Sequence, residues 1–219
     1  MRWADYTVGA EMDCRHDGVV ALGLGGPEAS HPPEPFAPYF ERGRAAGLHA
    51  APHAGEHAGP ASVRGALDAL GAERIAHGVR AVEDPALVVE LAVRGVALDI
   101  CPTSNLRPGV YPSLAEHPLP QLHAAGVALT INSDDPPLFG TTLTDEAELL
   151  ADYFGLDVAA IDEILLNGVR HSFLPAPAKE HLLDYYRAEQ GGAQGRTPGA
   201  VTSRRRPAGQ RAGRRAPVR

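Results

Sequence analysis

Residues 48–57, Leu-His-Ala-Ala-Pro-His-Ala-Gly-Glu-His, place an imidazole at His53 and a carboxylate at Glu56, with two small residues between them. The stretch follows a helix-like segment that ends at Gly47, which indicates a short strand turning into a loop. A metal ligand beside an acid that can move protons is what a metal-activated water needs. Taken by itself, the run is also typical of a solvated surface turn.

Two later stretches have the same form, an apolar run that ends in polar groups. Residues 74–79 carry His77 near their end, and in residues 128–136 a β-rich run ends in the adjacent carboxylates Asp134 and Asp135. Two neighbouring carboxylates are costly unless a cation lies nearby. Because the strand ends of a parallel α/β fold meet at one face, we expect these side chains to lie close together.

The spacing of the apolar runs predicts repeating βα units. Strand ends fall about 24 residues apart, which suits a strand followed by a helix. The expected strands are residues 19–26, 48–54, 74–79, 96–102 and 127–132. Between them we expect one helix capped by Ser62 and another that begins at Asp84 and ends at Gly95, and after the last strand a helix that begins at Asp157. This pattern fits a doubly wound sheet or a (β/α)8 barrel, and the helices expected after the fifth strand favour the closing end of a barrel. Five units cannot close an eight-stranded barrel, so we expect about the last five, with the others N-terminal to them.

Length and composition bound the class of protein. The chain has 219 residues, of which 44% are hydrophobic, enough for one domain with a sizeable core. No apolar run approaches the roughly 18 residues of a membrane span, and the first residues lack the apolar core of a signal peptide. Cys14 and Cys101 are far apart, which argues against a disulfide framework. We expect a cytoplasmic protein with no membrane partner.

Charge divides the chain into an acidic body and a basic end. Residues 191–219 hold eight arginines and no acidic residue, which leaves 12 basic and 27 acidic side chains in residues 1–190. The basic stretch is rich in Gly, Pro and Ala and has almost no apolar periodicity, so we expect disorder there. The predicted domain is therefore residues 1–190, followed by a disordered tail. A nucleic-acid-binding arm is the less favoured interpretation of that tail.

Five short motifs occur in order between residues 20 and 175: Gly23-Leu-Gly-Gly-Pro-Glu28, His53-Ala-Gly-Glu56, Arg74-Ile-Ala-His77-Gly-Val-Arg80, Cys101-Pro-Thr-Ser-Asn105 and Asn132-Ser-Asp134-Asp135-Pro136. Together they resemble the adenosine deaminase family of zinc-dependent purine deaminases. Each motif is weak evidence alone, whereas five in the family's order are specific. The resemblance implies an α/β fold, a (β/α)8 TIM barrel of the metallo-dependent hydrolase type, here reduced to about its last five βα units.

The resemblance also implies roles for the residues in these motifs. His53 and Asp134 are similar to zinc ligands, one from a barrel strand and one from the last strand. Glu56 is similar to the acid that protonates the purine ring nitrogen beside the reacting carbon. His77 is similar to the group that orients and deprotonates the attacking water. The implied reaction is hydrolysis at the carbon that bears the 6-amino group, with loss of ammonia.

Two further residues are similar to positions that bind the purine. Gly26 corresponds to a backbone donor to its pyrimidine ring, and Asp135 to a hydrogen-bonding partner of its imidazole ring. Structural alternatives stay open for both. Gly26 also suits a simple turn, and Asp134 with Asp135 also suits a pair of helix-capping acids. Within the fourth motif, Ser104 and Asn105 are expected to make loop hydrogen bonds rather than to act in catalysis.

One part of the family pattern is missing. The family takes two more zinc ligands from a His-x-His pair on its first strand, and no His-x-His occurs in the 219 residues. Catalytic zinc sites normally use at least three protein ligands, so His53 and Asp134 alone make a poor Zn²⁺ site. We therefore expect full activity to require residues upstream of Met1.

The leading functional hypothesis is an aminohydrolase for a small 6-aminopurine: adenosine, adenine or a modified nucleoside such as aminodeoxyfutalosine. The first alternative is a non-catalytic fragment or pseudoenzyme that acts through protein association, since unpaired strand edges favour self-association. A second is another metal hydrolase on the same fold.

Overall fold

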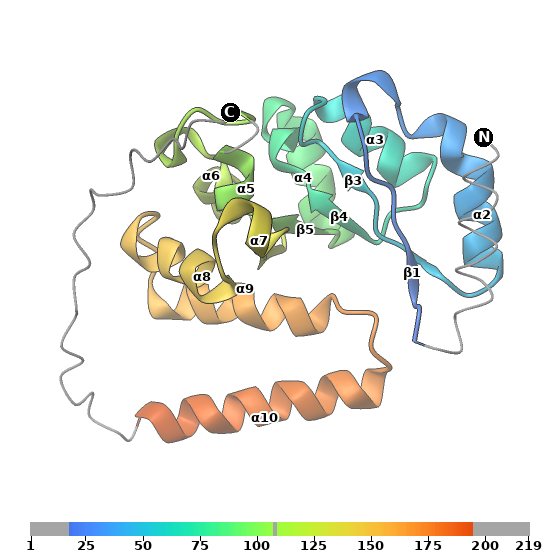
Figure 1. The fold of residues 1–219 in the computed structure, drawn as a ribbon. Coiled ribbons are helices and arrows are strands. Elements are labelled where there is room, and N and C mark those ends of the chain that lie inside the picture. The colour runs from blue at the N-terminus through green and yellow to red at the C-terminus, as the bar shows by residue number, and fades with distance from the viewer. Residues whose placement is uncertain (1–17, 107–108, 195–219) are drawn as a thin grey trace, which may run out of the picture.

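The computed structural model describes residues 18–106 and 109–194, and the strands in these ranges are all parallel (Figure 1). They form two short sheets, ordered β1-β2 and β3-β4-β5-β6. Each strand lies within a predicted apolar run. The bounds are β1 Ala21–Leu22, β2 His49–Ala50, β3 His53–Ala54, β4 Arg74–His77, β5 Ala97–Ile100 and β6 Leu129–Ile131.

The two sheets are one layer interrupted at a proline. The amides of His49 and His53 donate to carbonyls on the β1 side, and the carbonyl of Pro52 accepts from the β4 side. Pro52 has no N–H of its own, so the ladder breaks between β2 and β3 although the segment stays extended. Residues 49–54 are therefore the single strand that the sequence predicts at this place.

Strand order decides between the two predicted architectures. Along the described strands the spatial order equals the chain order, with no point where the order reverses. A doubly wound sheet contains such a reversal, whereas a barrel adds its strands in succession. The chain forms part of a β/α barrel.

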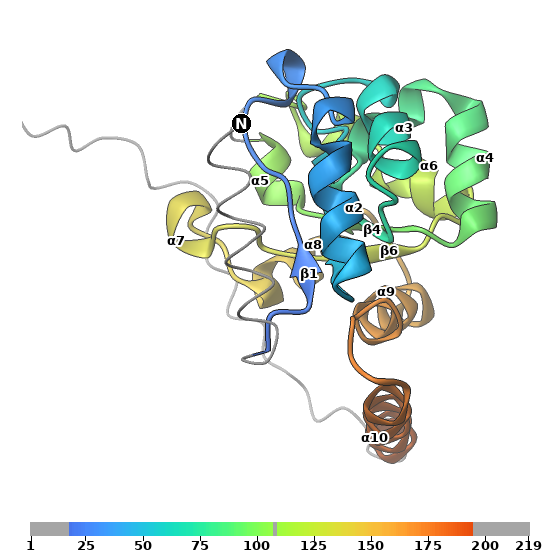
Figure 2. The ribbon, with the colours of Figure 1, turned by 90° about the vertical axis from the view of Figure 1, so that its right-hand side faces the viewer.

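The helices cover the outer side of the strands. Figure 2 shows α2, α3 and α4 in succession along one side of them. The α-helices and their bounds are α2 Ala37–Ala45, α3 Pro60–Asp68, α4 Pro85–Arg94, α5 Pro102–Leu106, α6 Leu119–Ala124, α7 Pro136–Phe139, α8 Leu143–Asp152, α9 Val158–Arg170 and α10 Ala176–Gln194. Short 3-10 helices are η2 Glu28–Ser30, η3 Glu34–Phe36, η4 Val79–Glu83 and η5 Leu114–Glu116.

Helix ends follow the predicted signals, with one exception. The Asp84 carboxylate accepts from the first amides of α4, and Gly95 ends that helix with a φ of 63°. Asp157 likewise caps α9. The prediction that Ser62 caps a helix is wrong: α3 begins at Pro60, and the Ser62 hydroxyl donates to Glu28 instead.

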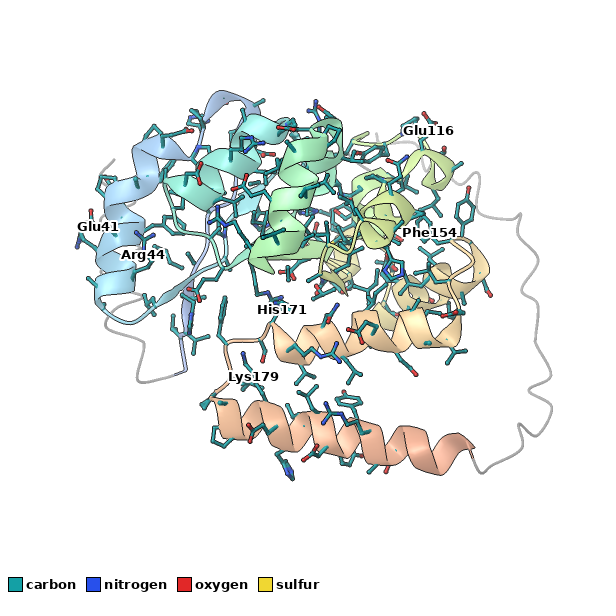
Figure 3. All side chains as sticks on the ribbon, turned by 180° about the vertical axis from the view of Figure 1, so that it is seen from behind. Glu41, Arg44, Glu116, Phe154, His171 and Lys179 are labelled. Atoms are coloured by element: carbon teal, nitrogen blue, oxygen red, sulfur yellow. The ribbon has the colours of Figure 1, made fainter. Side chains whose placement is uncertain are left out.

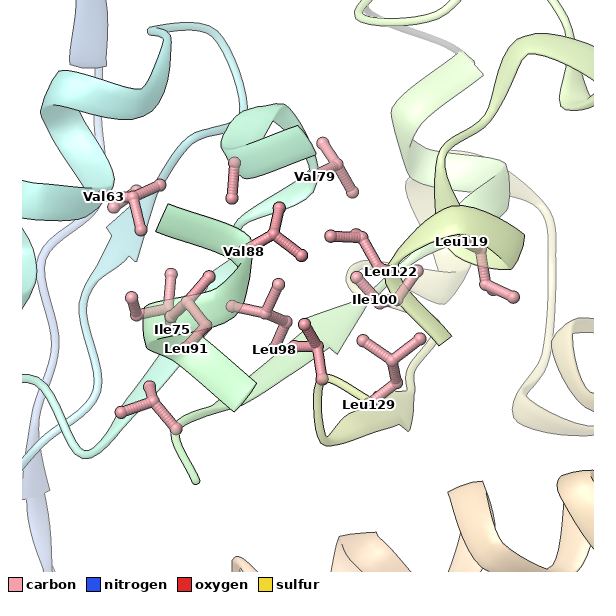
Figure 4. Packing of buried hydrophobic residues seen from close by; sticks show 14 of the residues in the cluster. Val63, Ile75, Val79, Val88, Leu91, Leu98, Ile100, Leu119, Leu122 and Leu129 are labelled. Atoms are coloured by element: carbon pink, nitrogen blue, oxygen red, sulfur yellow. The ribbon is translucent and has the colours of Figure 1, made fainter. Parts of the chain in front are cut away.

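The core lies between the strands and the outer helices. Strand residues Ile75, Leu98 and Leu129 are fully or almost fully buried, and Figure 4 shows them facing Leu91 and Leu122 from α4 and α6. At about 25 cal/mol per Å² of apolar surface, each such leucine or isoleucine contributes roughly 1.5–3 kcal/mol to folding. This cluster fixes the strand ends at which the predicted site residues lie.

Helix α9 packs against β6, where the Asn167 side chain donates to the carbonyl of Leu129, and α10 lies on the far side of α9. Figure 1 shows α9 and α10 side by side, and Figure 3 places His171 and Lys179 at the turn between them. The Lys179 ammonium donates to the carbonyl of Arg170 at 3.0 Å, which ties the start of α10 to the end of α9. No helix in the described ranges combines the length and apolarity needed to span a bilayer.

The predicted tail falls mainly outside the described residues. Helix α10 continues to Gln194, so the first four residues of the predicted 191–219 tail are helical. The predicted disorder of residues 195–219 lies outside the described residues, and the domain boundary at residue 190 stays a prediction.

Candidate active site

Two of the predicted site residues have an unusual backbone conformation. His77, at the end of β4, has a φ of 66°, and Asp134, three residues after β6, has a φ of 56°. Within the described ranges they are the two non-glycine residues with positive φ. This left-handed region is unfavourable for residues with a Cβ, and such strain collects at functional sites.

Four of the six predicted residues converge. His77 Nε2 lies 3.8 Å from Glu56 Oε2 and 3.9 Å from Asp134 Oδ2. The rings of His53 and His77 are 5.3 Å apart between centroids. His77 is buried, with 2% of its side chain exposed, while Glu56 and Asp134 reach the surface. An imidazole pair and two carboxylates therefore meet where β3, β4 and β6 end.

Burial is the main influence on His77. Removal from water lowers its pKa, the carboxylates of Glu56 and Asp134 raise it, and the neighbouring His53 lowers it, with a net pKa below the ordinary value. At neutral pH the ring is therefore uncharged. A neutral imidazole beside two carboxylates suits proton handling rather than ion pairing.

Glu28 holds the loop that carries Glu56, a role that the sequence did not reveal. One carboxylate oxygen accepts from the amide of Gly55 and the hydroxyl of Ser62. The other accepts from the next three amides: those of Glu56 at 3.1 Å, His57 at 2.8 Å and Ala58 at 3.0 Å. Burial raises the pKa of Glu28, but these hydrogen bonds outweigh it and the net pKa is lowered. The carboxylate is thus a charged anchor for this loop.

Helix α5, which follows β5, supports the other two residues of the cluster. The Ser104 hydroxyl donates to Asp134 Oδ2 at 2.6 Å, and the side-chain nitrogen Nδ2 of Asn105 lies 3.2 Å from His77 Nδ1. Glu146 is fully buried and accepts from the backbone of Thr103, which fixes the start of α5. The sequence predicts loop hydrogen bonds for Ser104 and Asn105, but both residues lie on α5 and their partners belong to the candidate site.

Gly26 and His53 line a pocket of about 190 Å³. Its other walls come from η2, η3 and the loop after β1, including Leu24, Glu28 and Phe36. Gly26 has a φ of 137°, which glycine alone adopts readily, so a turn role explains it as well as a binding role does. The pocket opens beside the imidazole of His53.

Asp135 is placed differently from the other predicted residues. Its carboxylate accepts from the amide of Leu138 at 3.4 Å and begins α7. This is the helix-capping alternative that the sequence left open for the acid pair. The purine-binding role of Asp135 stays a prediction.

The converging side chains form a metal-type donor set. One donor atom each of His77, Cys101 and Asp134 lie within 4.8 Å of one another. Burial and the surrounding carboxylates raise the pKa of the Cys101 thiol, which keeps it protonated and a weak ligand. Imidazole and carboxylate are ligands that zinc accepts, so the donor types fit the predicted ion. Of the two zinc ligands that the resemblance implies, Asp134 belongs to this donor set and His53 does not, so the ligand role of His53 stays a prediction. Two ligands are also fewer than the three that catalytic zinc normally has.

Comparison with curated proteins finds deaminases. The chain is 48% identical over 170 residues to the aminodeoxyfutalosine deaminase of Streptomyces coelicolor. The match covers 78% of this chain and 44% of that protein. It is 45% identical over 161 residues to the adenine deaminase of a Chelativorans species, covering 74% of this chain and 50% of the relative. The chain spans about half the length of the curated relatives it matches.

Solved structures share the fold. The adenine deaminase of Arthrobacter aurescens superposes with a TM-score of 0.79 at 33% identity, over 86% of this chain and 58% of that one. An amidohydrolase of Burkholderia ambifaria with bound zinc gives a TM-score of 0.80 at 27% identity, over 88% of this chain and 55% of its own. The predicted partial TIM barrel is confirmed.

The model of the adenosine deaminase family matches residues 2–188. This match extends beyond residues 20–175, the range in which the five motifs occur. The chain therefore belongs to the adenosine deaminase family.

Proposed function

We propose that this chain supplies the proton-transfer half of a zinc-dependent deaminase site for a small 6-aminopurine. The observation that supports it is that Glu56 and Asp134 each lie within 4 Å of His77 Nε2, with the ring of His53 beside that of His77. Adenine and aminodeoxyfutalosine are the substrates in the names of the relatives, and both carry the 6-aminopurine group. We favour these two over adenosine.

In this proposal His53 and Asp134 hold zinc together with ligands from outside the described residues. A bound zinc ion supplies a water that ionises near neutral pH. Glu56, when protonated, donates to the ring nitrogen beside the carbon that loses its amine. His77 contacts the attacking water from the buried side. Gly26 and the pocket beside His53 receive the purine, and Asp135 contacts its imidazole ring.

The test is ammonia release from adenine and from aminodeoxyfutalosine. The chain is assayed with zinc, alone and mixed with the part of the Streptomyces coelicolor relative that the match does not cover. We expect activity that needs both polypeptides and that Glu56→Gln and Asp134→Ala abolish. A folded, zinc-loaded mixture that releases no ammonia from either substrate would contradict the proposal.

The alternative function, association without catalysis, also has an observation behind it. In the described ranges β1 and β6 each pair with a strand on one side alone. A cavity of about 680 Å³ adjoins β6 and is lined in part by Ile131, Leu165 and Tyr186. Open strand edges beside apolar residues favour self-association. Size-exclusion chromatography separates the two: a monodisperse monomer counts against this function.

We also propose a cytoplasmic location, which rests on the two widely separated cysteines. A fluorescent fusion expressed in a bacterial host, followed by fractionation, tests it.

A further inference from the structure

A chain of hydrogen bonds connects the backbone of α6 to His77. The amide nitrogen of Leu119 lies 3.2 Å from His117 Nδ1. His117 Nε2 lies 3.1 Å from Asn105 Oδ1, and Asn105 Nδ2 lies 3.2 Å from His77 Nδ1. His77 Nε2 then faces Glu56 and Asp134. One imidazole and one carboxamide thus separate a backbone amide from His77 in the candidate site.

The backbone amide fixes the direction of donation along this series of hydrogen bonds. A backbone N–H can donate but never accept, so His117 Nδ1 must be the acceptor and its proton must be on Nε2. His117 Nε2–H then requires an oxygen, which turns the Asn105 carboxamide so that its N–H₂ group points to His77. His77 Nδ1 must accept from that group. The proton of a neutral His77 is therefore on Nε2.

The opposite arrangement fails at its first step. If the Asn105 carboxamide were reversed, its nitrogen would meet His117 Nε2, which would then have to accept. The proton of His117 would move to Nδ1 and meet the Leu119 N–H head-on. Two facing donors in a buried site cost about 1–3 kcal/mol or more.

Burial stabilises this arrangement of donors and acceptors. The exposed fractions are 0% for Asn105, 2% for His77 and 3% for His117. The His117 ring packs between Tyr111 and Phe154, with centroids 5.4 and 5.7 Å away. Burial lowers the pKa of His117 to about 4, so a doubly protonated ring is not present at neutral pH. Little water reaches these groups, and none of the three side chains can exchange partners easily.

We propose that Asn105 and His117 are positioning residues that hold His77 in the tautomer with its proton on Nε2, so that His77 faces Glu56 and Asp134 as a hydrogen-bond donor. The two carboxylates opposite Nε2 agree with this, because both are acceptors. The family resemblance gives His77 the task of removing a proton from the attacking water. A nitrogen that already carries a proton cannot do so.

The consequence for catalysis rests on the proposed function. His77 Nε2–H donates to the oxygen of the attacking water and orients its lone pair, but takes no proton from it. The Glu56 carboxylate, 3.8 Å from Nε2, accepts that proton on Oε2 as the O–H bond breaks. The same proton then passes from Glu56 to the purine ring nitrogen, which leaves Glu56 ionised as it began. One carboxylate serves both transfers.

The test measures the tautomers directly and does not need activity. Long-range ¹⁵N–¹H spectra distinguish a protonated Nδ1 from a protonated Nε2 on each histidine, and His77→Gln identifies the signals of His77. We expect Nε2–H on both His77 and His117 in the native chain. A proton on Nδ1 of either ring would overturn the proposal. Because free histidine also prefers Nε2–H, the decisive result comes from a variant.

Asn105→Asp is that variant, since it keeps the shape of the side chain and replaces the donor by an acceptor. At alkaline pH, with the new carboxylate ionised, His77 should move its proton to Nδ1 while His117 keeps Nε2–H. If His77 keeps Nε2–H, the carboxamide does not set its tautomer and the proposal fails.

His117→Phe tests the same chain if Asn105→Asp does not fold, because a second ring suits the aromatic surroundings. It frees the Asn105 carboxamide to reverse, and the Nδ1–H fraction of His77 should rise. An unchanged fraction would overturn the role of His117. Ser104→Ala is the matched control: Ser104 bonds Asp134 and not this chain, so both tautomers should stay as in the native protein. An equal shift there would also overturn the proposal. If the tautomers are as expected but the chain releases no ammonia in the deaminase assay, the result counts against the proposed function and not against this proposal.

Discussion

Replacing Glu28 by Gln tests whether one carboxylate holds the loop that carries Glu56 in place. The native side chain accepts five hydrogen bonds, four from consecutive amides and one from Ser62. Gln has nearly the same volume but a single acceptor oxygen, and its nitrogen is a donor. In the better of its two orientations, Ser62 reverses its hydroxyl and the Gly55 amide alone loses its acceptor.

The expected cost follows from these contacts. One buried N–H without an acceptor costs about 1–3 kcal/mol, and the three remaining amide bonds lose their charge assistance. Partial exposure of the site reduces both effects. We therefore expect Glu28→Gln to lower the free energy of unfolding by about 2–4 kcal/mol.

Urea denaturation at neutral pH measures the difference, and Glu41→Gln is the matched control. Glu41 is an exposed acid on α2, so its change should be within about 0.5 kcal/mol of zero. The pKa of Glu28 is lowered in the folded chain, so the difference should be complete above its ordinary value of 4.5 and shrink as the pH falls below it. A Glu28→Gln variant as stable as Glu41→Gln would refute the anchoring role.

Three further changes test other parts of the structure. Gly78→Ala places a Cβ 2.5 Å from a side-chain atom of Leu98, at a position where φ is 67°. We expect it to lower the free energy of unfolding by about 2–4 kcal/mol. The control is Gly95→Ala, where an added Cβ meets nothing within 4 Å, and equal melting temperatures of the two variants would contradict the prediction. Glu146→Ala leaves the Thr103 amide and the Thr141 hydroxyl without their acceptor, and should cost about 2–4 kcal/mol in urea denaturation; a neutral result would mean that another group replaces it. The lowered pKa of His117 means that the folded chain binds this proton less readily than the unfolded chain, so the stability that depends on it is complete above about pH 6.5 and decreases towards pH 4, by about 3 kcal/mol. Stability measured against pH should have a shallower slope in that window for His117→Phe, and an unchanged slope would contradict the assignment.

The sequence predicted the architecture because it depends on local patterns. Apolar runs ending in glycine or polar residues located the strands, and Asp84 and Asp157 marked helix starts as expected. Pro52 divides one predicted strand into two short pieces, which the apolar pattern did not indicate. The prediction for Ser62 failed because its hydroxyl has a partner 34 residues away, which outweighs its local capping preference.

The candidate site was predictable in its chemistry but not in its supports. His53, Glu56, His77 and Asp134 stood out because unusual polar groups end apolar runs. Glu28, Asn105 and His117 act through partners that are distant in the chain, and no spacing in the sequence joins them. The positive φ of His77 and Asp134 likewise arises from the folded surroundings. A glycine after His77 was the one local sign that the backbone turns sharply there.

Zinc binding to the isolated chain tests the central claim most directly. Isothermal titration with zinc, with metal content measured after dialysis, is done on the native chain and on His53→Ala, Asp134→Ala and His49→Ala. His49 lies in the same extended segment as His53 but pairs with Glu73, so it is the matched control. We predict one weak zinc site per chain, kept in His49→Ala and lost in both His53→Ala and Asp134→Ala. Zinc binding that survives both of those changes would contradict the assignment of the site.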